Sequence, residues 1–291
     1  MSGFTTPFDS LPNEILIAIL STFESRTLLP LALVDRRFNA TATAILQYRL
    51  LHTANMNGHE MMLESYHPSA KQSTPSISCR FTGVDFLNRE RPAEQDMDLR
   101  SLSQLYSHFR PVVSEATQRM RRVLSRRIPG APLPEEPKGD APVIQHLYLD
   151  DGELFSQLCT TTRLVKSEPG FGFFASRANI EKCVLRVWRH WLAKAAAQSA
   201  VAPMDEEQRQ ADESTVLWAD STKNVGLRFR VTELSRERTH ALRGLDEDPP
   251  VAYILHYEEL LVRTSQVLLA MEESALQEEV DLGKAIIITS S

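Results

Sequence analysis

The fold of this 291-residue chain has to bury much of a run of apolar residues that extends from Leu11 to Phe23. Apolar side chains recur there at spacings of three and four, which predicts a helix with Ser10 as its N-cap and Pro12 in its first turn. Ile17 adds an apolar side chain on another part of the circumference. The helix therefore carries more apolar surface than one buried face requires.

Two further helices are predicted after it. The second is expected to begin with Thr27 or Ser25 as N-cap, so that Pro30 lies among the first N–H groups, which have no helical partner. The third is expected to close over the first two with Ala42, Ile45, Leu46 and Leu50. Roughly forty residues cannot bury this much apolar surface among themselves. The excess either packs on the rest of the chain or docks another protein.

Two motifs stand in one register within residues 8–51: Leu-Pro-x-Glu-Ile-Leu-x-x-Ile-Leu from Leu11, and Val-x-Arg-Arg-Phe ending at Phe38. This pattern resembles an F-box, the three-helix module that docks onto the Skp adaptor of cullin-RING ubiquitin ligases. Phe23, Thr27 and Asp35 depart from the usual family pattern. The resemblance implies that five residues contact the adaptor, Leu11, Pro12, Ile15, Leu16 and Leu20, and that four complete the interface or the module core, Leu28, Leu31, Val34 and Phe38.

Alternating apolar and polar residues predict strands in the rest of the chain. The clearest is 225–231, with apolar residues at every second position and Arg228 and Arg230 on the opposite face. Further strand patterns lie at 80–86, 143–149, 183–188 and 251–257. No internal repeat is present, so five or six strands with polar outer faces predict a mainly antiparallel sheet or sandwich.

One inserted helix is predicted over residues 97–127, broken near Pro111. This helix carries a basic cluster that either binds phosphorylated or acidic substrates or neutralises the acidic loop 135–153. The cluster consists of Arg119, Arg121, Arg122, Arg126 and Arg127. Flexible loops are expected near 128–142, 195–214 and 236–250. The expected fold class is α+β, with an F-box at residues 1–51 and a β-rich substrate-binding domain at residues 52–291.

A Trp- and Arg-rich segment at residues 186–191 has the composition of a binding hot spot, although such residues also stack inside folded sheets. The candidate substrate-binding residues are Arg186, Trp188, Arg189, Trp191, Arg228 and Arg230. The chain beyond residue 51 is similar to uncharacterised F-box proteins of filamentous fungi, in segments 66–70, 106–111 and 186–192. That similarity implies no particular substrate.

No catalytic, metal or cofactor motif is found. Cys79, Cys159 and Cys183 are odd in number and lack metal-ligand spacing, which excludes a disulfide framework and favours a reducing compartment. The net charge of −6 argues against nucleic-acid binding. No stretch reaches the roughly 20 apolar residues of a membrane span, and residues 1–7 lack a basic signal region. We expect an intracellular protein of the cytoplasm or nucleus that is not an enzyme.

The F-box resemblance implies a substrate-recognition subunit of a Skp–cullin–F-box ubiquitin ligase. Its partners would be a Skp-type adaptor, through it a cullin scaffold, and an unknown protein substrate. The alternative is an adaptor-bound scaffold with a non-degradative structural role. A third possibility is an enzyme whose site lies unrecognised in the sheet.

Overall fold

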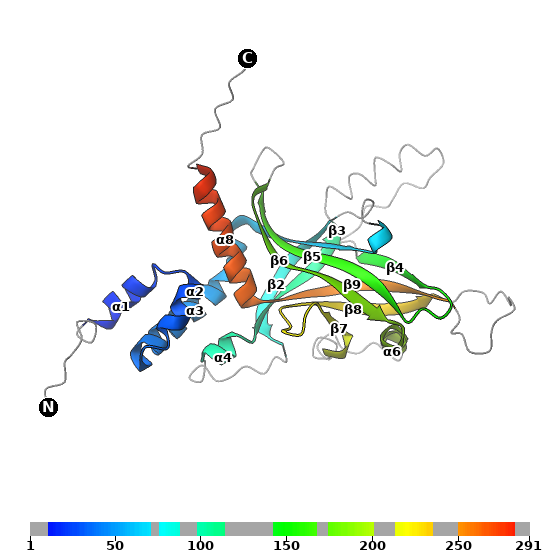
Figure 1. The fold of residues 1–291 in the computed structure, drawn as a ribbon, viewed down its shortest axis with the longest axis horizontal. Helices are drawn as coiled ribbons and strands as arrows, with labels where there is room; N and C mark the ends of the chain where they lie inside the picture. Colours follow the sequence, from blue (N-terminus) through cyan, green and yellow to red (C-terminus); the bar gives the residue numbers. More distant parts are fainter. Residues whose placement is uncertain are drawn as a thin grey trace, which may run out of the picture.

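The computed structural model describes residues 11–70, 76–87, 98–113, 142–167, 174–200, 213–234 and 250–282. Six α-helices and nine strands lie in these ranges, and the strands form one large, nearly closed antiparallel sheet. Three N-terminal helices gather at one end of this sheet (Figure 1). The α+β class and the antiparallel sheet are as predicted.

The N-terminal helices are α1 (Asn13–Leu20), α2 (Ser25–Leu31) and α3 (Arg36–His52). The predicted start of α2 is wrong, since Glu24 is its N-cap. Pro30 therefore lies inside the helix beyond the first turn, where its missing N–H costs one helical hydrogen bond. At α1 the N-cap is Pro12 itself, one residue before the first helical position.

The sheet has the order β6-β5-β1-β2-β3-β9-β8-β7, and β4 pairs with β9 beside β3. All pairs are antiparallel. The strands are β1 (His59–Tyr66), β2 (Ile77–Phe86), β3 (Leu105–Val113), β4 (Val143–Leu149), β5 (Phe155–Ser167), β6 (Phe174–Trp188), β7 (Val216–Trp218), β8 (Val225–Leu234) and β9 (Val251–Arg263). Each of the five predicted strands lies within one of these, whereas β1, β3, β5 and β7 were not predicted.

The predicted helix over 97–127 is wrong where the structure describes it. Only α4 (Leu99–Leu102) is helical, and Leu105–Val113 form β3, between β2 and β9. Phe109 is fully buried and Arg110 exposed, which is the two-residue period of a strand. The basic cluster at 119–127 lies outside the described residues, as do the predicted loop at 128–141 and residues 236–249.

The predicted loop at 195–214 is partly wrong as well. Residues up to Ala200 belong to α6 (Arg189–Ala200), because Leu192 and Ala195 are buried in the main core. Short 3-10 turns occur at η1 (Thr53–Gly58), η2 (Pro68–Ala70) and η4 (Glu213–Thr215). Residues 201–212 lie outside the described ranges.

Two apolar clusters explain how the helices meet the sheet. The main core lies inside the curved sheet and takes in Leu192 of α6 and Val267 of α8 (Thr264–Leu282). The second cluster joins α1, α2 and α3 to β2, β3, α4 and α8, where Leu102 and Leu268 are buried among the helix residues. Part of the apolar excess of the N-terminal helices thus packs on the rest of the chain. In the part of the chain that is described, no helix combines the length and apolarity needed to cross a membrane.

Candidate docking site on the N-terminal helices

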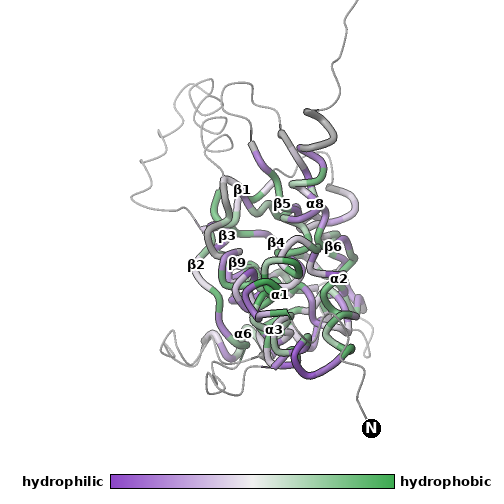
Figure 2. Tube along the Cα trace, turned by 90° about the vertical axis from the view of Figure 1, so that its left-hand side faces the viewer, coloured by the Kyte–Doolittle hydropathy of each residue, from purple (hydrophilic) through white to green (hydrophobic). Residues whose placement is uncertain are grey.

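Large apolar side chains remain exposed on α1, on α2 and in the turns that follow them. Their exposed fractions run from 39% to 83%: Ile15, Ile17, Ile19, Phe23, Leu29, Leu33 and Val34, which we name the N-terminal apolar surface. Ile15, Ile19 and Phe23 follow at intervals of four, so they share one side of α1 and its extension. Figure 2 shows α1 and α3 in front of the sheet when the molecule is viewed from this end. Large contiguous patches of exposed apolar side chains are typical of interaction sites, so this surface is a candidate docking site.

The nine residues assigned by the F-box resemblance divide into three groups. Leu16, Leu20 and Leu28 are at most 2% exposed and belong to the core beneath the surface. The half-buried ones are Leu11, Leu31 and Phe38, and the exposed ones are Pro12, Ile15 and Val34. The nine assigned residues did not include the exposed Ile19 and Leu33. With Leu16 and Leu20 facing inward, the helical period alone would have placed Ile15 and Ile19 outward.

Two charged residues of the second motif fix the start of α3 and join it to α1. Asp35 is the N-cap of α3, and its carboxylate accepts a hydrogen bond of 2.7 Å from the Phe38 N–H. Arg37 donates from Nε to Asn13 Oδ1 over 2.8 Å and also to the carbonyl oxygen of Leu11. These contacts join the start of α1 to α3. Asp35, which departs from the usual F-box pattern, therefore has a structural role in this chain as the N-cap of α3.

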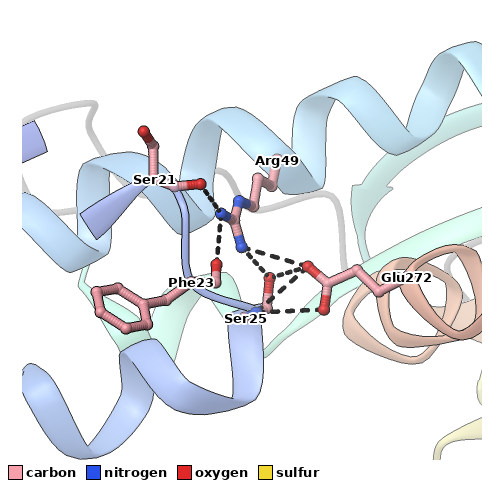
Figure 3. Close-up of polar contacts among 5 residues, drawn as sticks. All are labelled: Ser21, Phe23, Ser25, Arg49 and Glu272. Atoms are coloured by element: carbon pink, nitrogen blue, oxygen red, sulfur yellow. Dashed lines mark hydrogen bonds and ion pairs between the residues drawn. The ribbon is translucent and has the colours of Figure 1, made fainter. Parts of the chain in front are cut away.

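A polar cluster of Arg49, Ser25 and Glu272 fixes the turn between α1 and α2 (Figure 3). The Arg49 guanidinium donates to the carbonyl oxygens of Ser21 and Phe23 over 2.8 and 2.7 Å, and to Ser25 Oγ over 3.0 Å. It also lies 3.3 Å from Glu272 Oε1 on α8. The cluster thus links the turn between α1 and α2 to α3 and α8.

Glu272 additionally closes the N-terminus of α2. Its carboxylate accepts a 2.7 Å hydrogen bond from Ser25 Oγ, and the Ser25 N–H approaches its two oxygens at 3.2 and 3.3 Å. The first N–H groups of a helix have no helical acceptor, and an anion there also meets the positive end of the helix dipole. A side chain of α8 thus supplies the cap that Ser25 or Thr27 was predicted to supply.

The six candidate substrate-binding residues are not gathered in one place. Arg186 and Trp188 share the outer face of β6, where both meet the Phe155 ring, at 5.5 Å for the guanidinium carbon and 5.1 Å between ring centroids. Arg189 donates to the carbonyl oxygens of Glu153 and Asp150, each over 2.8 Å.

The other three candidate residues lie around β8. Trp191 donates from Nε1 to the Ser214 carbonyl oxygen over 3.0 Å and packs on the core residue Phe229. Arg228 is 3% exposed and lies 3.0 Å from Glu259, while Arg230 is exposed and lies 3.3 Å from Glu258. Among the six, only Arg186 and Trp188 form a common exposed patch.

One side-chain pair has the geometry of a nucleophile and its base. Ser274 Oγ lies 2.8 Å from His59 Nε2, and His59 Nδ1 lies 2.8 Å from the Met56 carbonyl oxygen. Ser274 is fully buried between α8 and the sheet and also contacts Ser176. The pair ties α8 to β1 and β6. Within the ranges that the structure describes, no group of three or more metal-ligating side chains gathers.

Comparisons with known proteins identify no family: no family model matches the chain, and no curated protein matches its sequence. The function is therefore argued from the geometry and the sequence motif.

Proposed function

We propose that this protein is a substrate-recognition subunit of a Skp–cullin–F-box ubiquitin ligase. In this proposal a Skp-type adaptor covers the N-terminal apolar surface and connects the chain to a cullin, while the sheet holds a substrate protein. The observation that carries the proposal is the exposure of Ile15 and Ile19 on α1 and of Leu33 and Val34 after α2, while Leu16, Leu20 and Leu28 beneath them are buried. Burying such side chains in an interface contributes about 25 cal/mol for each Å² of apolar surface removed from water.

The attachment of the helices to the sheet supports the same proposal. Leu28, Leu46 and Leu50 share a buried cluster with Leu102 and Leu268, so the helices pack directly against the rest of the chain. A receptor acts by holding its substrate at high local concentration and in a fixed orientation near the transferring enzyme. The packed junction between the N-terminal apolar surface and the sheet supports such a fixed orientation.

Co-purification with a Skp-type adaptor tests the proposal. The double variant Ile15→Glu, Val34→Glu places two charges on the apolar surface and should abolish adaptor binding by the folded protein. Both positions are exposed, at 48% and 62%, so the variant should keep the far-UV circular dichroism and thermal unfolding of the wild type. Ile144→Glu on β4 is the matched control, because Ile144 is 50% exposed and lies on the sheet.

Adaptor binding that survives in the folded double variant would overturn the assignment of the docking surface. A folded wild-type chain that binds no adaptor would overturn the proposed function as a whole. A reconstituted ligase then separates the degradative role from the scaffold role: the scaffold alternative requires adaptor binding without ubiquitin transfer to any protein that the chain binds.

A further inference from the structure

A cavity of about 210 Å³ lies where α2, α3, α4 and the beginning of α8 meet, at the junction between the N-terminal helices and the sheet (Figure 1). Its described lining residues are seven leucines, three serines and one arginine, Arg26. Protein interiors contain few voids larger than a water molecule, and an apolar cavity of roughly 150 Å³ is large enough to bind benzene. This cavity therefore has room for a small organic molecule.

The leucines of the cavity differ in their exposure, which distinguishes its floor from its mouth. The floor belongs to the second apolar cluster and consists of residues that are at most 8% exposed, Leu46, Leu50, Leu102 and Leu268. At the mouth Leu29, a member of the N-terminal apolar surface, is 51% exposed, and Leu99 and Leu269 are half-buried. An apolar chain that enters at Leu29 is thus surrounded by leucine side chains.

Two polar groups of the lining have no partner of their own. Arg26 is exposed, and in the part of the chain that is described its guanidinium forms no ion pair or hydrogen bond. It lies three positions before Leu29 on α2, so the two side chains share one side of the helix. The half-buried Ser265 hydroxyl, at the beginning of α8, likewise has no hydrogen-bond partner among the described residues. A guanidinium and a hydroxyl beside an apolar cavity are complementary to a carboxylate.

The carboxylates near this cavity already have partners. Glu272 on α8 lies 3.3 Å from the Arg49 guanidinium. Asp98, the N-cap of α4, accepts hydrogen bonds of 2.7 and 2.9 Å from the N–H and the hydroxyl of Ser101. Neither carboxylate is among the described lining residues, so the charged side chain of the lining is the cation Arg26.

We propose that this cavity binds a small carboxylic acid with an apolar tail, of the class of the medium-chain fatty acids. The tail occupies the leucine-lined space, and the carboxylate is bound at the mouth by Arg26 and Ser265. Burial of the tail supplies affinity, and the two polar groups select an acid over a neutral or cationic molecule. The site goes beyond the proposed function, because neither its lining nor its ligand involves an adaptor or a substrate protein.

Titration of the full chain with octanoate tests this inference, by calorimetry and by NMR of the leucine methyl groups. Octanoate should bind at least about threefold more tightly than octanol, and octylammonium more weakly than either. From butanoate to octanoate the affinity should rise about fourfold with each methylene that is buried. The methyl signals of Leu29, Leu99 and Leu269 should shift on binding. Those of Leu149 and Leu255, in the main core, should not.

Two variants separate the contribution of the charge from that of the cavity. Arg26→Gln should lower the affinity for octanoate to that for octanol and leave octanol binding unchanged. Arg36→Gln is the matched control, because Arg36 is exposed on α3 outside the cavity lining. Leu269→Trp fills the mouth and should abolish binding of both probes. Its control is Leu276→Trp, since Leu276 is 48% exposed on the same helix outside the lining.

The inference is overturned if octanoate does not bind, if octanol binds as tightly, or if the two arginine variants bind octanoate alike. Methyl shifts confined to other parts of the protein would also overturn it, as would binding that persists in Leu269→Trp with wild-type far-UV circular dichroism. If Leu269→Trp does not fold, Arg26→Gln and the methyl shifts still decide. Because the chain is tested alone, failure here is distinct from failure of adaptor docking.

Discussion

Arg49 on α3 and Glu272 on α8 form an ion pair, with Nη1 and Oε1 3.3 Å apart across 223 positions of sequence. Both side chains are partly shielded from water, at 19% and 24% exposure. The pair lies at the junction between the N-terminal helices and the sheet, and Ser25 hydrogen-bonds to both members. The ion pair therefore stabilises this junction together with the neighbouring apolar cluster.

Replacing Glu272 by alanine should loosen this junction. The change removes the ion pair and leaves the Ser25 N–H, near the buried start of α2, without its carboxylate acceptor, which should lower the free energy of unfolding by about 1–3 kcal/mol. Urea unfolding measures the loss, and hydrogen exchange should show faster exchange in α1 and α2. Glu273→Ala is the control, because Glu273 is exposed and should change stability by no more than about 0.5 kcal/mol. Equal effects of the two variants would show that the junction depends on the apolar cluster alone.

The N-cap of α3 can be tested without touching the apolar surface. Asp35→Ala removes the 2.7 Å hydrogen bond to the Phe38 N–H and should cost about 0.5–2 kcal/mol in thermal or urea unfolding. Asp35→Asn keeps a capping oxygen and should restore most of the stability. If Asp35→Asn is as unstable as Asp35→Ala, the charge of Asp35 matters more than its capping bond.

The sequence predicted best those strands whose two faces differ most. In β8 the apolar residues at 225, 227, 229 and 231 are all buried, so the two-residue period of the sequence predicted the strand, although Arg228 on the opposite face is buried as well. Around β3, the residues Leu102, Leu105 and Phe109 follow at spacings of three and four, as they would in a helix. In the structure Leu102 ends α4, whereas Leu105 and Phe109 belong to the strand. Sheet pairing on both sides of β3 determines its conformation, and no local pattern reports such pairing.

Of the candidate docking site, only the features that depend on the local helical pattern could be predicted from the sequence. The helical period of the first apolar run separates Leu16 and Leu20 from Ile15 and Ile19, and the structure buries the first two and exposes the last two. The cap that Glu272 provides could not be foreseen, because it depends on where α8 lies.

Gly226 should not tolerate a larger residue. A Cβ atom there would lie 2.8 Å from two ring carbons of Trp218 and 2.8 Å from Val216 Cγ1 on the neighbouring strand β7. Gly226→Ala should therefore lower the free energy of unfolding by about 1–3 kcal/mol and displace the Trp218 ring. Gly83→Ala is the control, because no atom lies within 4 Å of its added Cβ. Unchanged urea unfolding and tryptophan fluorescence of Gly226→Ala would contradict this account of β7.

A buried charge cluster at Glu259 should make stability depend on pH. Glu259 accepts a 2.8 Å hydrogen bond from His108 Nδ1 and lies 3.0 Å from Arg228 Nε. Burial opposes the charged carboxylate, but His108 and Arg228 outweigh it, so the pKa of Glu259 lies below its ordinary value of 4.5. A depressed folded pKa contributes stability above the unfolded pKa, and that stability is lost as the pH falls through the folded pKa.

Glu259→Gln should consequently be destabilised most near neutral pH, by up to about 3–5 kcal/mol, because Arg228 is buried and loses the carboxylate that faces it. The difference from the wild type should shrink as the pH falls below about 4.5, since the carboxyl then gains its proton in the unfolded chain first and, below its lowered pKa, in the folded protein as well. Urea unfolding at a series of pH values measures this convergence. The adjacent Glu258→Gln is the control, because its partner Arg230 is 49% exposed and such pairs contribute at most about 1 kcal/mol. A difference between Glu259→Gln and the wild type that stays constant with pH would show that the carboxyl contributes through packing instead of charge.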